Sequence, residues 1–453
     1  MPELYDPKAE SREFVKGVMV IGLPIMIQNL INSLVNMLDV FMVGQLGEVE
    51  ITSASLGNSW FFVFTLLCGG ITAAGSIFIA QHWGKNDREK IYQYMGIMFI
   101  GVMILTAILG TASICFSDRI IRLYSKDPLV IEKGGQYIKV VGFSYLFTSI
   151  TGVYVAALRS TEQTRIPMIS TVLSLFCNLI LNYLLIFGHF GFPELGVLGA
   201  AIATLISRII ECMFIVGCTY IKKLPAAGRF RDFIHIPSQV ARLYFRYGLF
   251  VILGEAIYAV GSSMYNVAYK YTGTQAQAAL QIVNSCKSLS MVFTIGIGNS
   301  AGVVIGKMLG ENKLDKAKRF CKKYLFFTPV FAAAVSVLLC LFSPLLLQCF
   351  QIGEQAHAYA SQMIYILAFE LPFRAINFTI IVGILRSGGD SFYCFMSNFC
   401  GTWLFGLPMA FLGAVVLKLP VPIVLLMVTA DEIGKFFICL PRAVKYKWIK
   451  NLT

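Results

Sequence analysis

Residues 22–47 read GLPIMIQNLINSLVNMLDVFMVGQLG, and residues 248–273 read GLFVILGEAIYAVGSSMYNVAYKYTG. The two stretches align without a gap at an offset of 226 residues, and their span and loop positions match although few residues are identical. Each contains enough apolar sequence for a helix of about 20 residues, the length that crosses the hydrocarbon core of a bilayer. The pair therefore predicts one membrane-spanning helix that occurs twice, once in each half of the chain.

Composition extends this interpretation to the whole chain of 453 residues. Hydrophobic residues make up 57% and charged residues 13%, and the mean hydropathy is +0.73, whereas soluble domains contain roughly 25% charged residues. The apolar runs are continuous and lack the alternation of barrel strands, so they predict helices. Roughly twelve spans fit and leave no room for a sizeable soluble domain, which excludes soluble enzymes and nucleic-acid-binding modules.

The repeat continues beyond the first span of each half. GKND from Gly84 faces GENK from Gly310, and LRSTEQ from Leu158 faces LRSGGD from Leu385. Six spans per half preserve orientation, so the halves are expected to be related by an axis along the membrane normal, with a substrate route between them. The predicted fold is an all-α integral membrane protein with about twelve transmembrane helices in two pseudo-symmetric six-helix lobes. The predicted spans are residues 17–44, 51–84, 91–116, 130–158, 166–188, 195–221, 245–270, 277–308, 321–349, 358–385, 393–417 and 421–441.

Basic residues predict the orientation. If both termini lie on one side, that side carries most of the 37 Lys and Arg residues, and the positive-inside rule makes it the cytoplasm. The net charge of +13 then records orientation and not a nucleic-acid partner. The predicted segments are a cytoplasmic N-terminal segment (1–16), an N-lobe (17–221), a cytoplasmic linker (222–244), a C-lobe (245–441) and a cytoplasmic C-terminal tail (442–453).

Cofactor sites are not expected. Most of the twelve cysteines fall inside predicted spans without a C-x-x-C motif, and the four histidines lack metal-ligand spacing. Cysteine is an ordinary small packing residue in such helices. The sequence therefore assigns no cofactor and no catalytic residue.

Asp39 is the first carboxylate placed inside a span, about five residues or roughly 8 Å from its outer end. In span 5, Asn178 and Asn182 stand at i and i+4 on one helical face, and they can meet Asp39 in one cavity. A carboxylate with amide oxygens suits a hard monovalent cation, and it can instead bind a proton when burial disfavours its charged form. The alternative is a hydrogen-bonded packing cluster, since Asn commonly joins transmembrane helices.

Glu255 is the second such carboxylate, roughly ten residues into span 7. Its repeat partner is Asn29, so the two lobes are chemically unequal. Tyr258 and Ser262 follow at i+3 and i+7 and form a polar stripe in an otherwise apolar span. This pattern predicts a separate proton or cation site in the C-lobe, with a structural carboxylate as the alternative.

Glu370 has Arg374 at i+4, within reach of an intrahelical ion pair, and Asn377 continues that face. Structural pairing and a role in a cavity are both open for this group. Lys287 in span 8 has no partner nearby in the sequence, and we hypothesise that it pairs with Glu255 or Glu370. The candidate substrate-binding residues are Asp39, Glu255, Lys287, Glu370, Tyr258 and Asn377.

Charged residues near the predicted cytoplasmic ends of spans 6 and 12 receive a different interpretation. Long side chains reach the membrane surface from such positions at little cost. We interpret these residues as anchoring or gating groups: Arg208, Glu211, Asp431, Glu432 and Lys435.

Four segments together give the chain a resemblance to a known family: LDVFMVGQLG in span 1, LRSTEQTRIPM after span 4, CNLILNYLLIFG in span 5 and LRSGGDSFYC after span 10. With its two six-span halves, the chain resembles the bacterial multidrug and toxic compound extrusion (MATE) transporters, NorM-like branch, of the MOP-flippase fold type, over about residues 15–445. The resemblance implies secondary antiport, in which an inward Na⁺ or H⁺ gradient drives export of amphipathic, mostly cationic drugs. It also implies a monomer embedded in the lipid bilayer of the bacterial cytoplasmic membrane.

The resemblance also implies roles for single residues. Asp39 stands at the family's span 1 carboxylate, which is implicated in cation or proton binding, and Asn178 and Asn182 match its span 5 polar pair. Some relatives have a second carboxylate at the latter position. Glu255 matches the span 7 glutamate implicated in coupling, whereas the branch's span 10 aspartate is missing and Glu370 is its candidate substitute. Four further residues are interpreted as ordering cytoplasmic loops: Arg159, Glu162, Arg386 and Asp390.

Two other functions compete with drug export. A flippase for lipid-linked precursors, of the same broad fold, predicts a strongly cationic cavity. The central spans contain at least as many carboxylates as basic residues, which are Lys287 and Arg374, and this favours cationic cargo. An intramembrane enzyme such as a prenyl transferase would need an aspartate-rich diphosphate motif, and the sequence contains none. The sequence does not distinguish Na⁺ from H⁺ coupling, because both need an accessible carboxylate.

Overall fold

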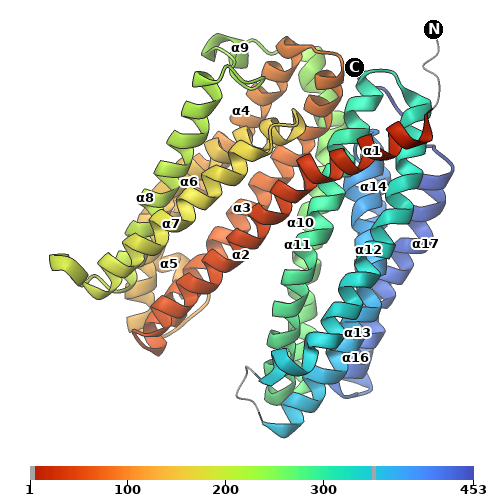
Figure 1. Ribbon diagram of the computed structural model, residues 1–453. Coiled ribbons are helices and arrows are strands. Elements are labelled where there is room, and N and C mark those ends of the chain that lie inside the picture. The colour runs from red at the N-terminus through yellow and green to blue at the C-terminus, as the bar shows by residue number, and fades with distance from the viewer. Residues whose placement is uncertain (1–5, 349–352) are drawn as a thin grey trace. The chain divides into compact units, whose positions relative to one another are not determined.

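The computed structural model of the protein describes residues 6–348 and 353–453, apart from the side chains of residues 36, 37, 40, 41, 274, 275, 278 and 346. The described residues form helices and their connections, without a β-strand (Figure 1). The predicted all-α class is therefore confirmed. In chain order, the first helices are α1 (Pro7–Gly17), α2 (Leu23–Gly44), α3 (Glu48–Gly84), α4 (Arg88–Cys115), α5 (Ser117–Arg122), α6 (Pro128–Ser160), α7 (Arg165–Phe187), α8 (Val197–Ile221) and α9 (Phe230–Ile234). The remainder are α10 (Ser238–Tyr269), α11 (Thr274–Gly310), α12 (Leu314–Gln348), α13 (Glu354–Phe378), α14 (Ser391–Phe399), α15 (Leu407–Phe411), α16 (Val421–Val428) and α17 (Ala430–Val444).

Short π-helical or 3₁₀ turns join several of these helices into longer rods. A π-helical segment, Val18–Gly22, continues α1 into α2, and another, Thr379–Leu385, extends α13. The segments between α14 and α16 are similar, at Cys400–Gly406 and Leu412–Val416. The first span therefore begins near Pro7, and most of the predicted N-terminal segment 1–16 is helical. The 3₁₀ turns are His189–Gly191 and Lys270–Thr272.

Aspartates at the starts of helices explain several boundaries. The side chains of Asp6, Asp87 and Asp127 accept hydrogen bonds from backbone N–H groups in the first turns of α1, α4 and α6, at 2.8, 3.1 and 2.9 Å. Such caps satisfy donors that have no partner inside the helix. At the end of α7, Gly188 has φ +70°, the left-handed conformation that commonly ends a helix.

Eleven helical stretches among the described residues are long and apolar enough to cross a membrane. They correspond to the first eleven predicted spans. The twelfth predicted span, 421–441, is divided into α16 and α17 at Thr429, whose hydroxyl donates to the carbonyl of Leu426 at 2.6 Å. A side chain that bonds its own backbone competes with regular helix geometry, and α17 then begins with two carboxylates, Asp431 and Glu432, next to the positive end of its dipole.

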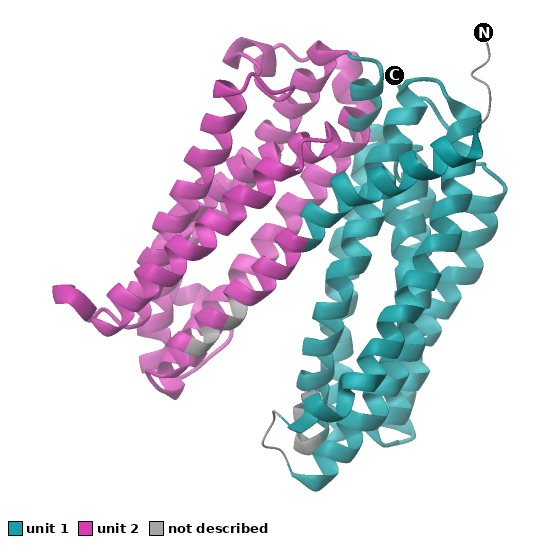
Figure 2. Ribbon diagram, viewed as in Figure 1, with its two compact units in different colours: residues 1–26, 80–86, 246–453 teal, residues 27–79, 87–245 magenta. Residues whose placement is uncertain are grey.

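Contacts divide the chain into two compact units, which we describe separately (Figure 2). Unit 1 comprises residues 1–26, 80–86 and 246–453, and unit 2 comprises residues 27–79 and 87–245. The boundary falls inside α2, α3 and α10, so these units differ from the predicted lobes. The lobe boundaries remain a prediction about which parts move together.

Unit 2 is built around α6, which packs against both α4 and α8. Phe64 and Tyr145 stack in its core with ring centroids 4.1 Å apart. The predicted linker contains α9, and a Cβ at Gly96 of α4 would lie only 1.9 Å from the carbonyl oxygen of Phe233 in α9. The absence of a side chain at Gly96 thus lets α9 lie directly on α4, so this part of the linker is packed and not a free tether.

Unit 1 contains a close crossing of the ends of α3 and α11. A Cβ at Gly84 would lie 2.2 Å from the carbonyl oxygen of Lys307, and a Cβ at Gly310 would lie 1.8 Å from that of Gln81. Both glycines, and both carbonyls, are related by the offset of 226 residues found in the sequence. The repeat therefore has a direct structural counterpart at this crossing.

Both ends of the chain pack onto unit 1. In α1, Phe14 lies edge-on against Phe320, Tyr324 and Phe327 of α12. Near the C-terminus, Trp448 is fully buried and Gln81 accepts a hydrogen bond from the backbone N–H of Leu452 at 2.8 Å. The described part of the predicted N-terminal segment, residues 6–16, and the predicted C-terminal segment are thus parts of the packed structure.

Candidate functional site

The structure brings Asp39, Asn178 and Asn182 together in unit 2. The side-chain amide of Asn182 on α7 donates to the Oδ1 atom of Asp39 on α2 at 2.5 Å, and to the Oδ1 atom of Asn178 at 3.1 Å. Both asparagines are buried. Their i, i+4 spacing places them on the face of α7 that meets α2, as the sequence indicated. Their functional role remains a prediction.

A cavity of about 70 Å³ adjoins Asp39. Four polar residues that the sequence did not single out also line it: Ser55 and Asn58 on α3, Tyr137 on α6 and Thr204 on α8. The Tyr137 hydroxyl donates to the Oδ1 atom of Asn58 at 3.0 Å. Each stands among other polar residues of its helix, and polar residues occur at many packing positions, so spacing along the chain could not have selected them.

The oxygens near Asp39, on its contact Asn182 and in the adjoining cavity, suit a small cation. The Oδ1 atom of Asn182 is buried and has no hydrogen-bond partner within the described part of the chain, and a buried acceptor without a donor is rare. It lies on the same side chain that contacts Asp39. One carboxylate, an unpartnered amide oxygen and neighbouring hydroxyl groups are the donor types that hard cations prefer, and the same carboxylate can accept a proton.

A chain of polar contacts continues from this region through unit 2. Arg208 on α8, one turn after Thr204, donates to the carboxylate of Glu211 at 2.8 Å, and it also interacts electrostatically with Asp39. The Thr171 hydroxyl donates to Glu211 at 3.3 Å and accepts from the amide of Gln28 at 2.8 Å. The oxygen of that amide accepts from Arg159. Arg159, at the end of α6, therefore donates a hydrogen bond to Gln28 on the neighbouring helix α2. This contact differs from its predicted role of ordering a loop.

Glu255 has a basic partner in unit 1. Arg386 donates to its carboxylate at 2.9 Å. The Arg386 side chain is only 8% exposed and that of Glu255 is 29% exposed. The hypothesis that Lys287 pairs with Glu255 is wrong, because the end of α13 and its π-helical extension brings an arginine to that carboxylate instead.

Glu370 forms the predicted ion pair with Arg374, whose Nε atom donates to it at 2.9 Å. Arg374 also lies 3.4 Å from Glu432 on α17. The amide of Asn377 donates to the backbone carbonyl of Glu432 at 2.7 Å and to its carboxylate at 2.9 Å. Lys287 makes no ion pair with Glu370 in the described structure, so that part of the hypothesis is also wrong.

The residues of α17 that were interpreted as anchoring or gating groups are buried. Asp431, Glu432 and Lys435 are each 5% exposed or less, and Lys435 lies 2.7 Å from Asp431 and 3.7 Å from Glu432. The Tyr265 hydroxyl donates to Asp431 at 2.8 Å, and Lys435 lies over the ring of Tyr258, 5.7 Å from its centroid. Packing of α13 against α17 thus buries these groups within unit 1, which does not fit an anchoring role at the membrane surface. Their gating role stays a prediction.

These contacts define a charge cluster inside unit 1. Lys287 lies close enough to interact electrostatically with its acidic and basic members, although it contacts none of them directly. The cluster contains equal numbers of acidic and basic side chains, so its formal charges cancel. Its members are Glu370, Asp431, Glu432, Lys287, Arg374 and Lys435.

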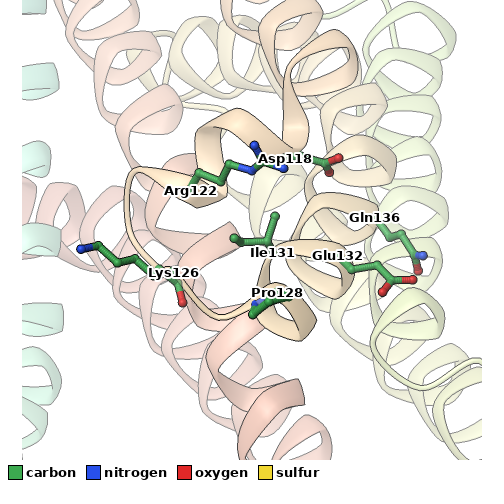
Figure 3. Close-up of a pocket in the computed structure, with 8 residues that line it drawn as sticks. Asp118, Arg122, Lys126, Pro128, Ile131, Glu132 and Gln136 are labelled. Atoms are coloured by element: carbon green, nitrogen blue, oxygen red, sulfur yellow. The ribbon is translucent and has the colours of Figure 1, made fainter.

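A larger pocket of about 680 Å³ lies on the surface of unit 2, where α5 and the start of α6 meet (Figure 3). Asp118 and Arg122 come from α5, and Glu132 and Gln136 come from α6. All four residues are exposed. None of the predicted site residues lines this pocket, so we do not assign the functional site to it.

Comparisons with known proteins agree with the membrane-transport character of the fold. A family model described as MatE matches residues 24–184 and 239–412. The chain is 27% identical over 409 residues to a Thermotoga maritima protein named Probable multidrug resistance protein NorM, with 90% of this chain and 87% of that protein covered. A protein of the same name from Rhizobium meliloti is 27% identical over 334 residues, with 72% and 70% covered.

Solved structures share the fold at low sequence identity. A structure described as MATE in complex with MaL6 has a TM-score of 0.86 at 19% identity and covers 95% of this chain and 96% of its own. A transporter of the MOP superfamily from Pyrococcus furiosus has a TM-score of 0.84 at 19% identity, with 95% and 94% covered. These likenesses concern the arrangement of helices alone.

Proposed function

Because the chain belongs to the MatE family, a family of transporters, we propose that it is a secondary antiporter that exports amphipathic, mostly cationic organic compounds in exchange for inward Na⁺ or H⁺. Relatives named as multidrug resistance proteins support the proposed cargo. The proposal places the protein in the bacterial cytoplasmic membrane with both termini in the cytoplasm, acting as a monomer by alternating access.

The contrast between Asp39 and the carboxylates of unit 1 carries this proposal. Among the described residues, no Lys, Arg or His lies within ion-pair distance of Asp39, whose direct partner is the neutral amide of Asn182. Glu255 and Glu370 each pair with an arginine, and Asp431 pairs with a lysine. An uncompensated carboxylate inside a membrane is costly and commonly marks an ion pathway.

Occupancy of the Asp39 site provides the coupling. A bound Na⁺ or proton neutralises the carboxylate, which reduces the cost of keeping it away from water. Because the ion binds one conformation more tightly than another, its binding shifts the conformational equilibrium. Exchange follows when a cationic substrate binds the conformation from which the ion has left. Glu255, Glu370 and Asn377 already have partners within unit 1, and we propose that they stabilise that unit and do not bind substrate.

Efflux of ethidium from proteoliposomes tests the coupling. Sodium and proton gradients are imposed separately on wild type, Asp39→Asn and the matched control Asp118→Asn, which removes an exposed carboxylate of the same unit. We expect one gradient to drive efflux in wild type and the control, and we expect Asp39→Asn to abolish the drive. Gradient-driven efflux that survives in Asp39→Asn would overturn the assignment of the site. Absence of driven efflux in wild type, with ethidium and with other organic cations, would favour a lipid-precursor flippase instead.

A further inference from the structure

Arg208 is hydrogen-bonded to one carboxylate of unit 2, Glu211, and interacts electrostatically with a second, Asp39. It donates to Glu211 through a single nitrogen, Nη1, at 2.8 Å. Its Nε–H is buried and has no hydrogen-bond partner within the described residues. A guanidinium carries five donors in a fixed planar arrangement, and the described residues offer Arg208 one side-chain acceptor, on Glu211.

The backbone of α8 around Arg208 is held in place by hydrogen bonds, whereas the guanidinium group of Arg208 is less constrained. The Ser174 hydroxyl on α7 donates to the carbonyl of Ser207 at 3.3 Å, and the Ser170 hydroxyl donates to that of Glu211 at 3.0 Å. These contacts hold α8 against α7. The Arg208 side chain itself remains 27% exposed, so it has room to change its partner without movement of the helix.

Asp39 is the second carboxylate available to this guanidinium. Arg208 is the charged side chain that acts electrostatically on Asp39 from α8, and it acts in the same way on Tyr137 of the adjoining cavity. The groups that face Asp39 from α7 are neutral amides. Thr204, which lines the cavity, lies one turn from Arg208 on the same face of α8.

We propose that Arg208 is a tethered counter-ion that exchanges between Glu211 and Asp39. It pairs with Glu211 while the coupling cation occupies the Asp39 site, and it pairs with Asp39 after that cation has left. This inference rests on the proposed ion coupling at Asp39. The exchange would compensate the carboxylate in the ion-free state, since a buried charge without a partner is strongly unfavourable, and it would thereby promote release of the ion. Arg208 is a positioning residue in this scheme and does not contact the substrate.

The test measures two quantities in the ethidium efflux assay: the half-saturating concentration of the driving ion and the maximal rate. Arg208→Gln removes the competitor, so we expect the half-saturating concentration to fall by about fivefold or more and the maximal rate to fall because release slows. Glu211→Gln frees Arg208 for Asp39, so we expect the half-saturating concentration to rise. Arg208→Lys keeps the positive charge and should stay closer to wild type than Arg208→Gln.

The double variant Arg208→Gln/Glu211→Gln separates exchange from simple electrostatics across space. If Glu211 acts through Arg208, the double variant behaves like Arg208→Gln alone. If the two charges act on Asp39 independently, their opposite effects cancel and the double variant returns towards wild type, which overturns the exchange. Shifts of both single variants in the same direction also overturn it.

Asp39→Asn, measured in parallel, keeps the two proposals distinguishable. If Asp39→Asn abolishes ion-driven efflux but the Arg208 variants do not behave as expected, only the proposed exchange of Arg208 is refuted. If ion-driven efflux is retained in Asp39→Asn, both the proposed coupling site and the proposed exchange are refuted.

Discussion

In unit 1, Asp431 and Glu432 lie beside Lys435 in a cluster whose acidic and basic groups are equal in number. In unit 2, Asp39 has a neutral amide as its direct partner. Both regions hold carboxylates at contacts between helices, and we infer that only the second is neutralised by a mobile positive charge. We infer that the fixed side-chain cations of unit 1 stabilise the structure, and that Asp39, whose direct partner is a neutral amide, serves ion exchange. The following substitutions should therefore affect stability in unit 1 and ion dependence in unit 2.

The largest effect on stability is expected for Lys435→Met. The substitution leaves Asp431 and Glu432 buried without their shared lysine, and breaking a buried ion pair from one side costs about 3–5 kcal/mol. Labelling of the buried cysteines, such as Cys286 and Cys439, with a thiol-reactive dye during heating reports unfolding in detergent. An apparent melting temperature equal to wild type would show that the cluster is not a stabilising structure.

The pair Asn377→Ala and Asn182→Ala compares similar contacts in the two units, because each asparagine donates to a carboxylate. Asn377→Ala removes hydrogen bonds to Glu432 and should destabilise the protein by about 1.5–3 kcal/mol, with the half-saturating concentration of the driving ion unchanged. Asn182→Ala should raise that concentration, since it removes an oxygen offered to the ion. The same melting and efflux assays measure both variants, and the reverse assignment of effects would contradict the comparison.

A smaller effect on stability is expected for Glu255→Gln. The glutamine can still accept a hydrogen bond from Arg386, but the charge is lost, at a cost of about 2 kcal/mol. We expect a lower melting temperature with ion-driven efflux retained. Loss of ion drive in a variant that remains folded would assign unit 1 a coupling role of its own, as the resemblance in sequence originally implied for Glu255.

Sequence reasoning succeeded where the signal was local. Apolar run lengths gave eleven of the spans, and the i, i+4 spacing of Asn178 and Asn182 placed both on the face that meets α2. Sequence reasoning failed where the partners of a charged side chain come from helices that are distant in the sequence. The burial of Lys435 depends on how α13 packs against α17, and nothing near Lys435 in the sequence records that packing.

The same limit explains the missed residues of the site. Asn58, Tyr137 and Thr204 reach one cavity from α3, α6 and α8, and no spacing rule connects positions so far apart. Arg386 offers a further example: it lies in a turn, as expected of a loop residue, but its partner Glu255 is 131 positions away. Pairing of charges across helices is a property of the tertiary structure and has no period in the sequence.

The smallest expected effect is the stabilisation of the folded protein by ion binding, which is measured without transport. A cation that binds only the folded protein stabilises it by RT ln(1 + [L]/Kd), or about 1.4 kcal/mol at tenfold excess over Kd. If Na⁺ is the coupling ion, replacing K⁺ by Na⁺ at constant ionic strength should raise the melting temperature of wild type and of Glu255→Gln, but not of Asp39→Asn. If protons couple transport, Na⁺ should have no effect on any variant, and lowering the pH should instead stabilise wild type relative to Asp39→Asn. A sodium-dependent shift that persists in Asp39→Asn and disappears in Glu255→Gln would reverse the roles of the two units, because the fixed arginine beside Glu255 would then have to give way to the ion.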